Sequence, residues 1–275
     1  MPRIALFQAN SGIDPNANRD ALLAAVDTAV AGGATMLFAP EMSGLLDGDR
    51  DRASRSVVSQ GDDRTLAAMC EAAARHSIWV HLGSLALRGD DGRFVNRSFV
   101  IDDQGRVRAH YDKIHLFDVD LPTGESWRES RTYQGGDRAV VVEGTPVGTL
   151  GLTICYDLRF PDLFARLAEA GADAVAVPAA FTVPTGKAHW HVLLRARAIE
   201  AGIFVIAAAQ AGEHEDGRET FGHSLVVDPW GEVVHDQEEG NKVAFCDIEL
   251  GRIGEVRSRV PALLHRRKIG TVERR

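Results

Sequence analysis

Short apolar runs alternate with longer amphipathic stretches along the first half of the chain. Runs with the apolar density or the alternation of β-strands occupy residues 3–9, 35–38, 78–87, 93–101 and 106–111. Stretches whose apolar positions repeat with the period of a helix occupy residues 16–31 and 62–76. Turn residues at 89–92 and 103–105 separate the last three runs, so the pattern predicts an antiparallel meander after two strand–helix units.

The second half repeats this alternation and ends in a hairpin and a further strand. Strand-like runs occupy residues 147–154, 173–177, 203–209, 221–227, 232–235 and 242–248. Helical runs occupy residues 163–170 and 189–201, and a short helix precedes a basic tail at 265–267. Strand–helix units mixed with hairpins predict an α/β fold in which two mixed sheets lie between two helix layers. We expect a single domain over residues 1–275, with its core over about residues 3–267.

Composition and charge narrow the possible classes of function. The 275 residues are 45% hydrophobic and 25% charged, which is typical of globular proteins. A formal net charge of -8 argues against a nucleic-acid partner, and no apolar run approaches the roughly 20 residues that cross a bilayer. The first residues show no signal-peptide pattern, and Cys70, Cys155 and Cys246 form no Cys-x-x-Cys pair. We therefore expect a cytoplasmic protein without a disulfide framework, a membrane partner or a zinc ribbon.

Residues 148–161 are the most informative stretch, because an apolar strand ends there at a cysteine and a polar turn. Cys155 follows the strand, and Pro161 opens the next helical run. A cysteine near a helix N-terminus is exposed to unpaired N–H groups and to the helix dipole, which favour the thiolate. The stretch suits a nucleophile, but the alternative is that Cys155 is a small buried hydrophobic residue, as free cysteines usually are.

Two other ionisable residues also follow apolar strands. Glu41 comes after Ala39-Pro40, and Lys113 comes after the third strand of the meander. A thiol nucleophile needs a base, and acyl transfer needs a donor for the developing oxyanion, so these residues fit the two roles. We expect three strands of one sheet to bring them to one edge beside Cys155. The alternatives are a solvated loop acid at Glu41 and a surface ion pair of Lys113 with Asp112 or Asp118.

The histidines suggest a different class, a metal-dependent amidohydrolase. His189 and His191, with His110 and His115, are the candidate ligands. His189 and His191 are two residues apart at the start of a helix, however, and helix-borne ligand pairs use a spacing of four. No glycine-rich phosphate loop follows a strand either, so we expect neither a metal nor another cofactor.

Residues 116–137 have no clear period, and a segment of this length is usually functional or mobile.

Several motifs in a fixed order identify the chain more closely. They are DKIHLFD at 112–118, GLTICYDLRFP at 151–161, TG at 185–186, AHW at 188–190, LRARA at 194–198, GHS at 222–224 and VDPWG at 227–231. Together they resemble the nitrilase superfamily of carbon–nitrogen hydrolases, and the resemblance extends from residue 3 to residue 267. AAAQ at 207–210, followed by His214, Arg218 and GHS, resembles the group of deaminated glutathione amidases within the branch that also contains ω-amidases.

The resemblance implies an α-β-β-α sandwich and a triad of Glu41, Lys113 and Cys155, with Glu129 as a second glutamate beside it. It implies that Glu41 takes the thiol proton, that Lys113 and the backbone N–H of Tyr156 hold the oxyanion, and that a thioester is hydrolysed after ammonia leaves. Two positions depart from the family pattern. Asp162 stands where Glu usually follows the proline, and Lys187 stands where Pro usually follows Thr185-Gly186.

Arg159 lies one short turn beyond the nucleophile, where its guanidinium suits a carboxylate on a small-molecule amide substrate. The alternative is an ion pair of Arg159 with Asp157. Phe181 and Thr182 complete the candidate substrate-binding residues.

We expect a cysteine amidase of the deaminated glutathione type. The alternatives are an ω-amidase acting on 2-oxoglutaramate or 2-oxosuccinamate and a non-catalytic partner-binding protein. We expect a homodimer that the helices at 163–170 and 189–201 would pack, and the alternative is that their apolar stripes only face the core.

Overall fold

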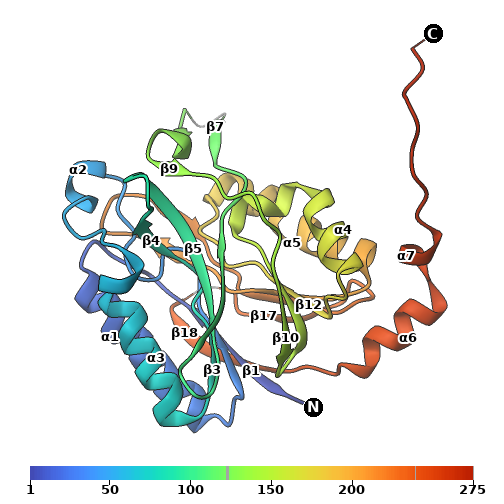
Figure 1. Cartoon of the computed structure of the whole chain (residues 1–275), viewed down its shortest axis with the longest axis horizontal. Coiled ribbons are helices and arrows are strands. Elements are labelled where there is room, and N and C mark those ends of the chain that lie inside the picture. Colours follow the sequence, from blue (N-terminus) through green and yellow to red (C-terminus); the bar gives the residue numbers. More distant parts are fainter. Residues whose placement is uncertain (122–123, 239, 275) are drawn as a thin grey trace.

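Four layers make up the fold, in the order helices, sheet, sheet, helices (Figure 1). The computed structural model describes residues 1–121, 124–238 and 240–274. One outer layer consists of α1 (Pro15–Ala31) and α3 (Arg64–His76), and the other consists of α4 (Pro161–Glu169) and α5 (Val183–Ala201). The predicted α-β-β-α sandwich of two mixed sheets is therefore confirmed.

The first sheet has the strand order β18-β1-β2-β3-β5-β4, and β6 and β9 also pair with β5. Its strands are β1 (Arg3–Gln8), β2 (Met36–Phe38), β3 (Trp79–His81), β4 (Leu85–Arg88), β5 (Phe94–Ile101), β6 (Val107–Asp112), β9 (Tyr133–Gln134) and β18 (Lys242–Asp247). Alternation along β1 divides its side chains between two cores. Ile4 and Leu6 pack against the second sheet, whereas Ala5 packs against α1 and α3.

The second sheet has the strand order β10-β11-β12-β13-β16-β17. Its strands are β10 (Val141–Thr145), β11 (Gly148–Leu152), β12 (Ala174–Ala176), β13 (Phe204–Ala207), β16 (Leu225–Val227) and β17 (Val233–Asp236). The three central strands β11, β12 and β13 are parallel and covered on both faces, which explains why their sequences are continuously apolar.

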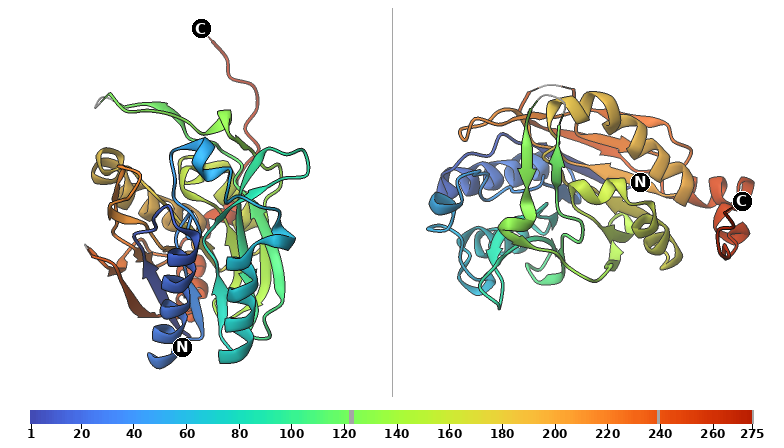
Figure 2. Two further views of the ribbon diagram at one scale, coloured as in Figure 1. Left: turned by 90° about the vertical axis from the view of Figure 1, so that its left-hand side faces the viewer. Right: turned by 90° about the horizontal axis from the view of Figure 1, so that it is seen from above.

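Shorter elements gather at one end of the sandwich, where the hairpin of β7 (Asp118–Asp120) and β8 (Ser126–Arg128) lies across the gap between the two halves (Figure 2). The other short elements are α2 (Arg50–Ala53), the hairpin of β14 (Ala211–Glu213) and β15 (Glu219–Phe221), and the 3-10 helices η1 (Gln60–Asp62), η2 (Glu129–Arg131) and η3 (Cys155–Arg159). Near the C-terminus, α6 (Gly251–Arg259) and α7 (Ala262–His265) precede an extended tail. Within the described ranges, none of the helices combines the length and the apolar character needed to cross a membrane.

Three local predictions were wrong. The run at 78–87 is two strands, because the chain turns at Gly83, whose φ is 28° and where a Cβ would overlap the carbonyl oxygens of Pro40 and Ala39. The helix predicted from 189 begins at Val183, since Pro184 fits the first turn of a helix. The segment 116–137 contains β7, β8, η2 and β9, although Pro122 and Thr123 lie outside the described residues.

Candidate active site

Glu41, Lys113 and Cys155 meet at the end of the sandwich, and they come from both sheets. Glu41 follows β2 and Lys113 follows β6, both in the first sheet, whereas Cys155 follows β11 in the second. The expectation that one sheet carries all three residues was therefore wrong, because the motif sequence shows strand ends without showing which sheet each strand joins. Glu41 connects the two sheets, since its Oε2 accepts a hydrogen bond from the N–H of Ala180 at 3.0 Å.

Lys113 is buried between two glutamates. Its Nζ lies 2.9 Å from Oε1 of Glu41 and 2.9 Å from Oε2 of Glu129, and the Lys113 side chain is only 3% exposed. Lys113 thus makes no surface pair with Asp112, which binds Arg97, or with Asp118, which binds Ser130. A buried ammonium held by two carboxylates is fixed in position, and its positive charge lies on the wall of the site.

The protonation states follow from these contacts. Burial alone would raise the pKa of Glu41, but the charge of Lys113 and hydrogen bonds from Cys155, Lys113 and Asn96 hold it below its ordinary value. Burial alone would lower the pKa of Lys113, but Glu129 and Glu41 raise it well above its ordinary value. Glu41 is therefore an ionised base, and Lys113 is a charged donor.

Cys155 is a protonated thiol in the resting site, which differs from the thiolate expected beside a helix N-terminus. Burial and the neighbouring Glu41 carboxylate raise the pKa of Cys155 well above its ordinary value, and Lys113 opposes them only in part. The residue has a φ of 50° and begins η3, whereas α4 starts six residues later at Pro161. The influence of Glu41 on this pKa shows that the carboxylate lies near the thiol, where it can act on the proton that must leave.

Asp157 fixes the turn that carries the nucleophile. Its buried carboxylate accepts hydrogen bonds from the hydroxyl of Tyr111, the backbone N–H of His115, the Nδ1 of His115 and the backbone N–H of Ile154. The alternative ion pair of Arg159 with Asp157 is not formed among the described residues. Arg159 instead lies over the rings of Tyr156 and Phe181, with its guanidinium 3.3 Å from Nδ1 of His189.

A cavity of about 690 Å³ opens onto the triad. Seven of the residues proposed from the sequence line it: Glu41, Lys113, Glu129, Cys155, Tyr156, Phe181 and Thr182. Arg159 is not among the lining residues, but its guanidinium lies over the rings of two of them, Tyr156 and Phe181. The volume suits a small-molecule ligand, and the wall combines six aromatic side chains with nine charged ones.

Sequence reasoning missed Asn96. Its Nδ2 donates to Oε1 of Glu41 at 2.9 Å and to Oε1 of Glu129 at 3.4 Å, so it joins the two carboxylates that hold Lys113. Asn96 lies in the middle of β5 and belongs to no motif that was recognised. Only the pairing of β5 with β6 brings it beside the residues at the strand ends.

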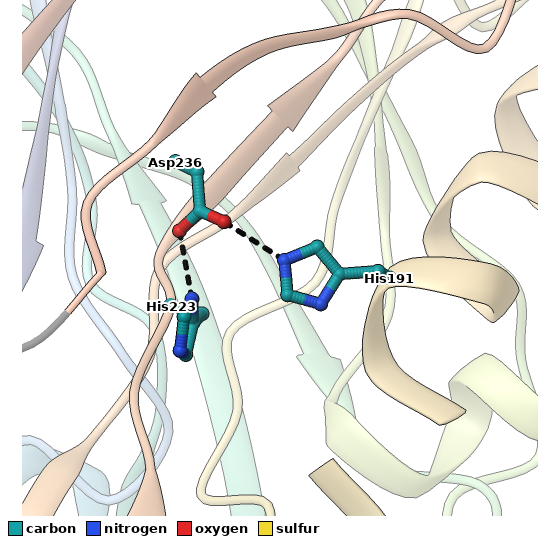
Figure 3. Close-up of side chains that lie close together, drawn as sticks. All are labelled: His191, His223 and Asp236. Atoms are coloured by element: carbon teal, nitrogen blue, oxygen red, sulfur yellow. Dashed lines mark hydrogen bonds and ion pairs between the residues drawn. The ribbon is translucent and has the colours of Figure 1, made fainter. Parts of the chain in front are cut away.

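The histidines do not gather around the cavity. His115 stacks on Phe160, and His189 contacts Arg159. His191 binds Asp236 through Nε2 at 2.8 Å, and His223 binds the other oxygen of Asp236 through Nδ1 at 2.9 Å (Figure 3). These last three residues have a donor set that could hold a metal ion, but none of them lines the cavity. The hydrogen bonds among His191, His223 and Asp236 give each carboxylate oxygen of Asp236 a partner and use one ring nitrogen of each histidine.

Relatives with known names can be aligned with most of the length of this chain. A model of the carbon-nitrogen hydrolase family matches residues 3–258. The deaminated glutathione amidase of Yersinia enterocolitica is 43% identical over 205 residues, which are 74% of this chain and 71% of that protein. The deaminated glutathione amidase of Rattus norvegicus is 39% identical over 272 residues, which are 97% and 83% of the two chains.

Solved structures of related proteins have the same fold as this chain. The NitFhit protein of Caenorhabditis elegans has a TM-score of 0.89 and 36% identity, and 97% of this chain covers 65% of that chain. Nit3 of Saccharomyces cerevisiae, a member of branch 10 of the nitrilase superfamily, has a TM-score of 0.85 and 26% identity, with 94% of each chain covered. The resemblance to the nitrilase superfamily is confirmed, and the chain belongs to the carbon-nitrogen hydrolase family, enzymes that act on carbon–nitrogen bonds other than peptide bonds.

Proposed function

We propose that the chain is a cysteine amidase in which Cys155, Glu41 and Lys113 perform nucleophilic, acid–base and electrostatic catalysis. The observation that carries this proposal is the buried pair of Glu41 and Lys113, 2.9 Å apart, on the wall of the cavity that Cys155 also lines. A thiol beside an ionised base can lose its proton as its sulfur attacks, so no free thiolate is required beforehand.

In the first half-reaction, the Cys155 sulfur attacks the amide carbonyl as Glu41 takes the thiol proton. The carbonyl oxygen becomes an oxyanion, which the Nζ of Lys113 and the N–H of Tyr156 hold. In the described part of the chain this N–H donates to no other group. The carbon–nitrogen bond then breaks, the leaving nitrogen takes the proton from Glu41, and a thioester on Cys155 remains.

In the second half-reaction, Glu41 takes a proton from water as the water oxygen attacks the thioester. The oxyanion forms at the same place, the carbon–sulfur bond breaks, and the sulfur recovers its proton from Glu41. Glu129 does not exchange protons in this scheme. It holds Lys113 through both carboxylate oxygens, and its Oε2 also accepts the N–H of Phe117 at 2.6 Å, so it orients the ammonium.

For the substrate we propose a deaminated glutathione, because relatives at 36–44% identity carry that activity in their names. The bond to be hydrolysed in deaminated glutathione is a secondary amide, so its hydrolysis releases the amine of a cysteinyl dipeptide. A primary amide such as 2-oxoglutaramate releases ammonia instead. Arg159 is proposed to bind the carboxylate beside the 2-oxo group, since its guanidinium lies against the two aromatic rings, Tyr156 and Phe181, that line the cavity. Phe181 and Thr182 would contact the acyl chain.

The test compares deaminated glutathione, 2-oxoglutaramate, 2-oxosuccinamate and a simple nitrile, with the carboxylic acid product as the readout. We expect hydrolysis of the first compound at the highest kcat/KM, and its complete loss in Cys155→Ala. Cys70→Ala is the matched control, because Cys70 is also a free cysteine but lies outside the cavity. Preference for 2-oxoglutaramate would favour the ω-amidase alternative, and failure with all four would favour a non-catalytic protein.

The assembly and the compartment belong to the same proposal. Val192 and Ile199 on α5 are 67% and 52% exposed and stand on one face of the helix, seven residues apart, so we propose that this face packs against a second copy of the chain. A cytoplasmic location is supported by the three free cysteines and by a mechanism that needs a reduced thiol.

A further inference from the structure

The mouth of the cavity has a different charge from its floor. The floor holds buried groups, Glu41, Lys113 and Cys155, whereas four arginines come from the shorter elements around the opening. These are Arg50, Arg128, Arg131 and Arg218.

Two of the four arginines are already neutralised. Arg128 binds both carboxylate oxygens of Asp120, at 2.7 and 2.8 Å, and Arg218 binds Asp216. Arg50 begins α2 and Arg131 ends η2, and both side chains are exposed. Within residues 1–121, 124–238 and 240–274, neither guanidinium has an acidic partner.

At the rim, the acidic groups of the wall cancel only one of these two charges. Asp47 binds Arg52 at 2.7 Å, and Glu41 and Glu129 are buried around Lys113. Glu219 is the remaining acid on the wall of the described cavity, so two arginines against one glutamate leave the rim with a net positive charge. Guanidinium groups without partners at the mouth of a substrate cavity favour an anionic ligand group, and their planar donors suit a carboxylate.

We propose that Arg50 and Arg131 bind the carboxylate carried by the leaving group of the substrate. The inference rests on the proposed function and assigns the part of the substrate that the triad and Arg159 leave unassigned. A deaminated glutathione has one carboxylate beside its 2-oxo group and a second at the end of its dipeptide leaving group. Two extended residues span about 7 Å, so the second carboxylate lies well beyond the scissile bond, outward from the buried triad.

Arg131 also lies close in sequence to the catalytic machinery. It belongs to the same 3-10 turn as Glu129, which orients Lys113. Binding of a carboxylate at the rim would hold this turn in place next to the reacting groups. The proposed rim site therefore selects substrates by their leaving group, whereas Arg159 selects them by their acyl group.

The experiment uses three substrates that share one acyl group: deaminated glutathione, the same compound with its terminal carboxylate converted to an amide, and 2-oxoglutaramate. Arg50→Gln, Arg131→Gln and the double variant are compared with Arg55→Gln. Arg55 is the matched control, because it is exposed and close to Arg50 in sequence but does not line the cavity. The melting temperature of each variant is measured to show that it is folded.

We expect the ratio of kcat/KM for deaminated glutathione to that for 2-oxoglutaramate to fall about 10-fold in each single variant and further in the double variant. The change should appear mainly in KM. With the wild-type enzyme, the amidated compound should show the same loss, and the double variant should no longer distinguish the amidated from the free acid. Arg55→Gln should retain the wild-type ratio.

The two levels of the proposal fail in different ways. If the wild-type enzyme distinguishes the free acid from its amide by less than about two-fold, or if the rim variants change all three substrates equally, the rim site is wrong while the amidase stands. If the wild-type enzyme hydrolyses 2-oxoglutaramate but not deaminated glutathione, the rim site is wrong and the ω-amidase alternative is favoured. If none of the three is hydrolysed, the proposed function itself fails.

Discussion

The hydroxyl of Tyr111 donates a hydrogen bond of 2.7 Å to Oδ2 of Asp157, and this contact joins the two halves of the active site. Tyr111 lies in β6 of the first sheet, two residues before Lys113, and Asp157 lies in η3, which follows β11 of the second sheet, two residues after Cys155. Both side chains are buried. The contact therefore fixes Lys113 and Cys155, the proposed oxyanion donor and nucleophile, relative to one another.

Tyr111→Phe should weaken both stability and catalysis. The change leaves a buried carboxylate with one donor fewer, which costs about 1–3 kcal/mol of unfolding free energy. It also loosens the turn that holds Cys155, so we expect kcat to fall about 10-fold with little change in KM. Urea unfolding and steady-state kinetics measure the two effects. A variant that loses stability but keeps full kcat would show that the contact only supports the fold.

The raised pKa of Cys155 predicts how stability depends on pH. Above about pH 8.5 the unfolded chain loses the thiol proton, whereas the folded chain keeps it because of burial and Glu41. The unfolded state then binds fewer protons, so stability falls as the pH rises. Cys155→Ala removes this contribution, and its melting temperature should decline less steeply than that of the wild type between pH 8 and pH 10. Parallel curves would contradict a protonated resting thiol.

Arg159→Gln should discriminate among substrates by their charge. We expect KM for a 2-oxo acid amide to rise about 10- to 100-fold, because one charge-assisted hydrogen bond to the carboxylate is lost. KM for a neutral amide of the same length should change little. Kinetics with the two amides measures the difference, and equal increases for both would indicate that Arg159 only supports the rings of Tyr156 and Phe181.

The sequence was sufficient for the layers of the fold and for choosing the three residues of the proposed triad, but not for how these residues are brought together. Apolar periodicity predicts each strand, yet it does not show which sheet a strand joins, so Cys155 was placed in the sheet of Glu41. Asn96 was missed because its role depends on the pairing of β5 with β6. The thiolate was expected from the helix dipole, whereas burial beside a carboxylate decides the protonation state. Each of these features depends on contacts between segments far apart in the chain.

The apolar face of α5 predicts an effect on assembly. Val192→Asp combined with Ile199→Asp should convert a dimer to a monomer, because two charges would be buried at the contact. Light scattering after gel filtration measures the mass. Val272→Asp is the control, since Val272 is 85% exposed in the tail. A wild-type monomer, or a double variant that remains dimeric, would contradict the proposed contact.

Chelation should leave the chemistry unchanged. The cluster of His191, His223 and Asp236 lies outside the cavity, and the proposed steps use only protein groups and water. Dialysis against EDTA should therefore preserve kcat within experimental error, whereas iodoacetamide should abolish it by alkylating Cys155. Loss of activity on chelation, with recovery on addition of Zn²⁺, would contradict the thiol mechanism.

The position of β18 has a consequence for the order in which the enzyme becomes active during synthesis. β18 pairs with β1 along six residues and forms one edge of the sheet that carries Glu41 and Lys113. A ribosome releases Glu41, Lys113 and Cys155 well before it reaches Lys242, so a nascent chain holds all three reacting groups while the first sheet still lacks its neighbour for β1. The proposed catalytic residues are made early, and the strand that completes their support is made late.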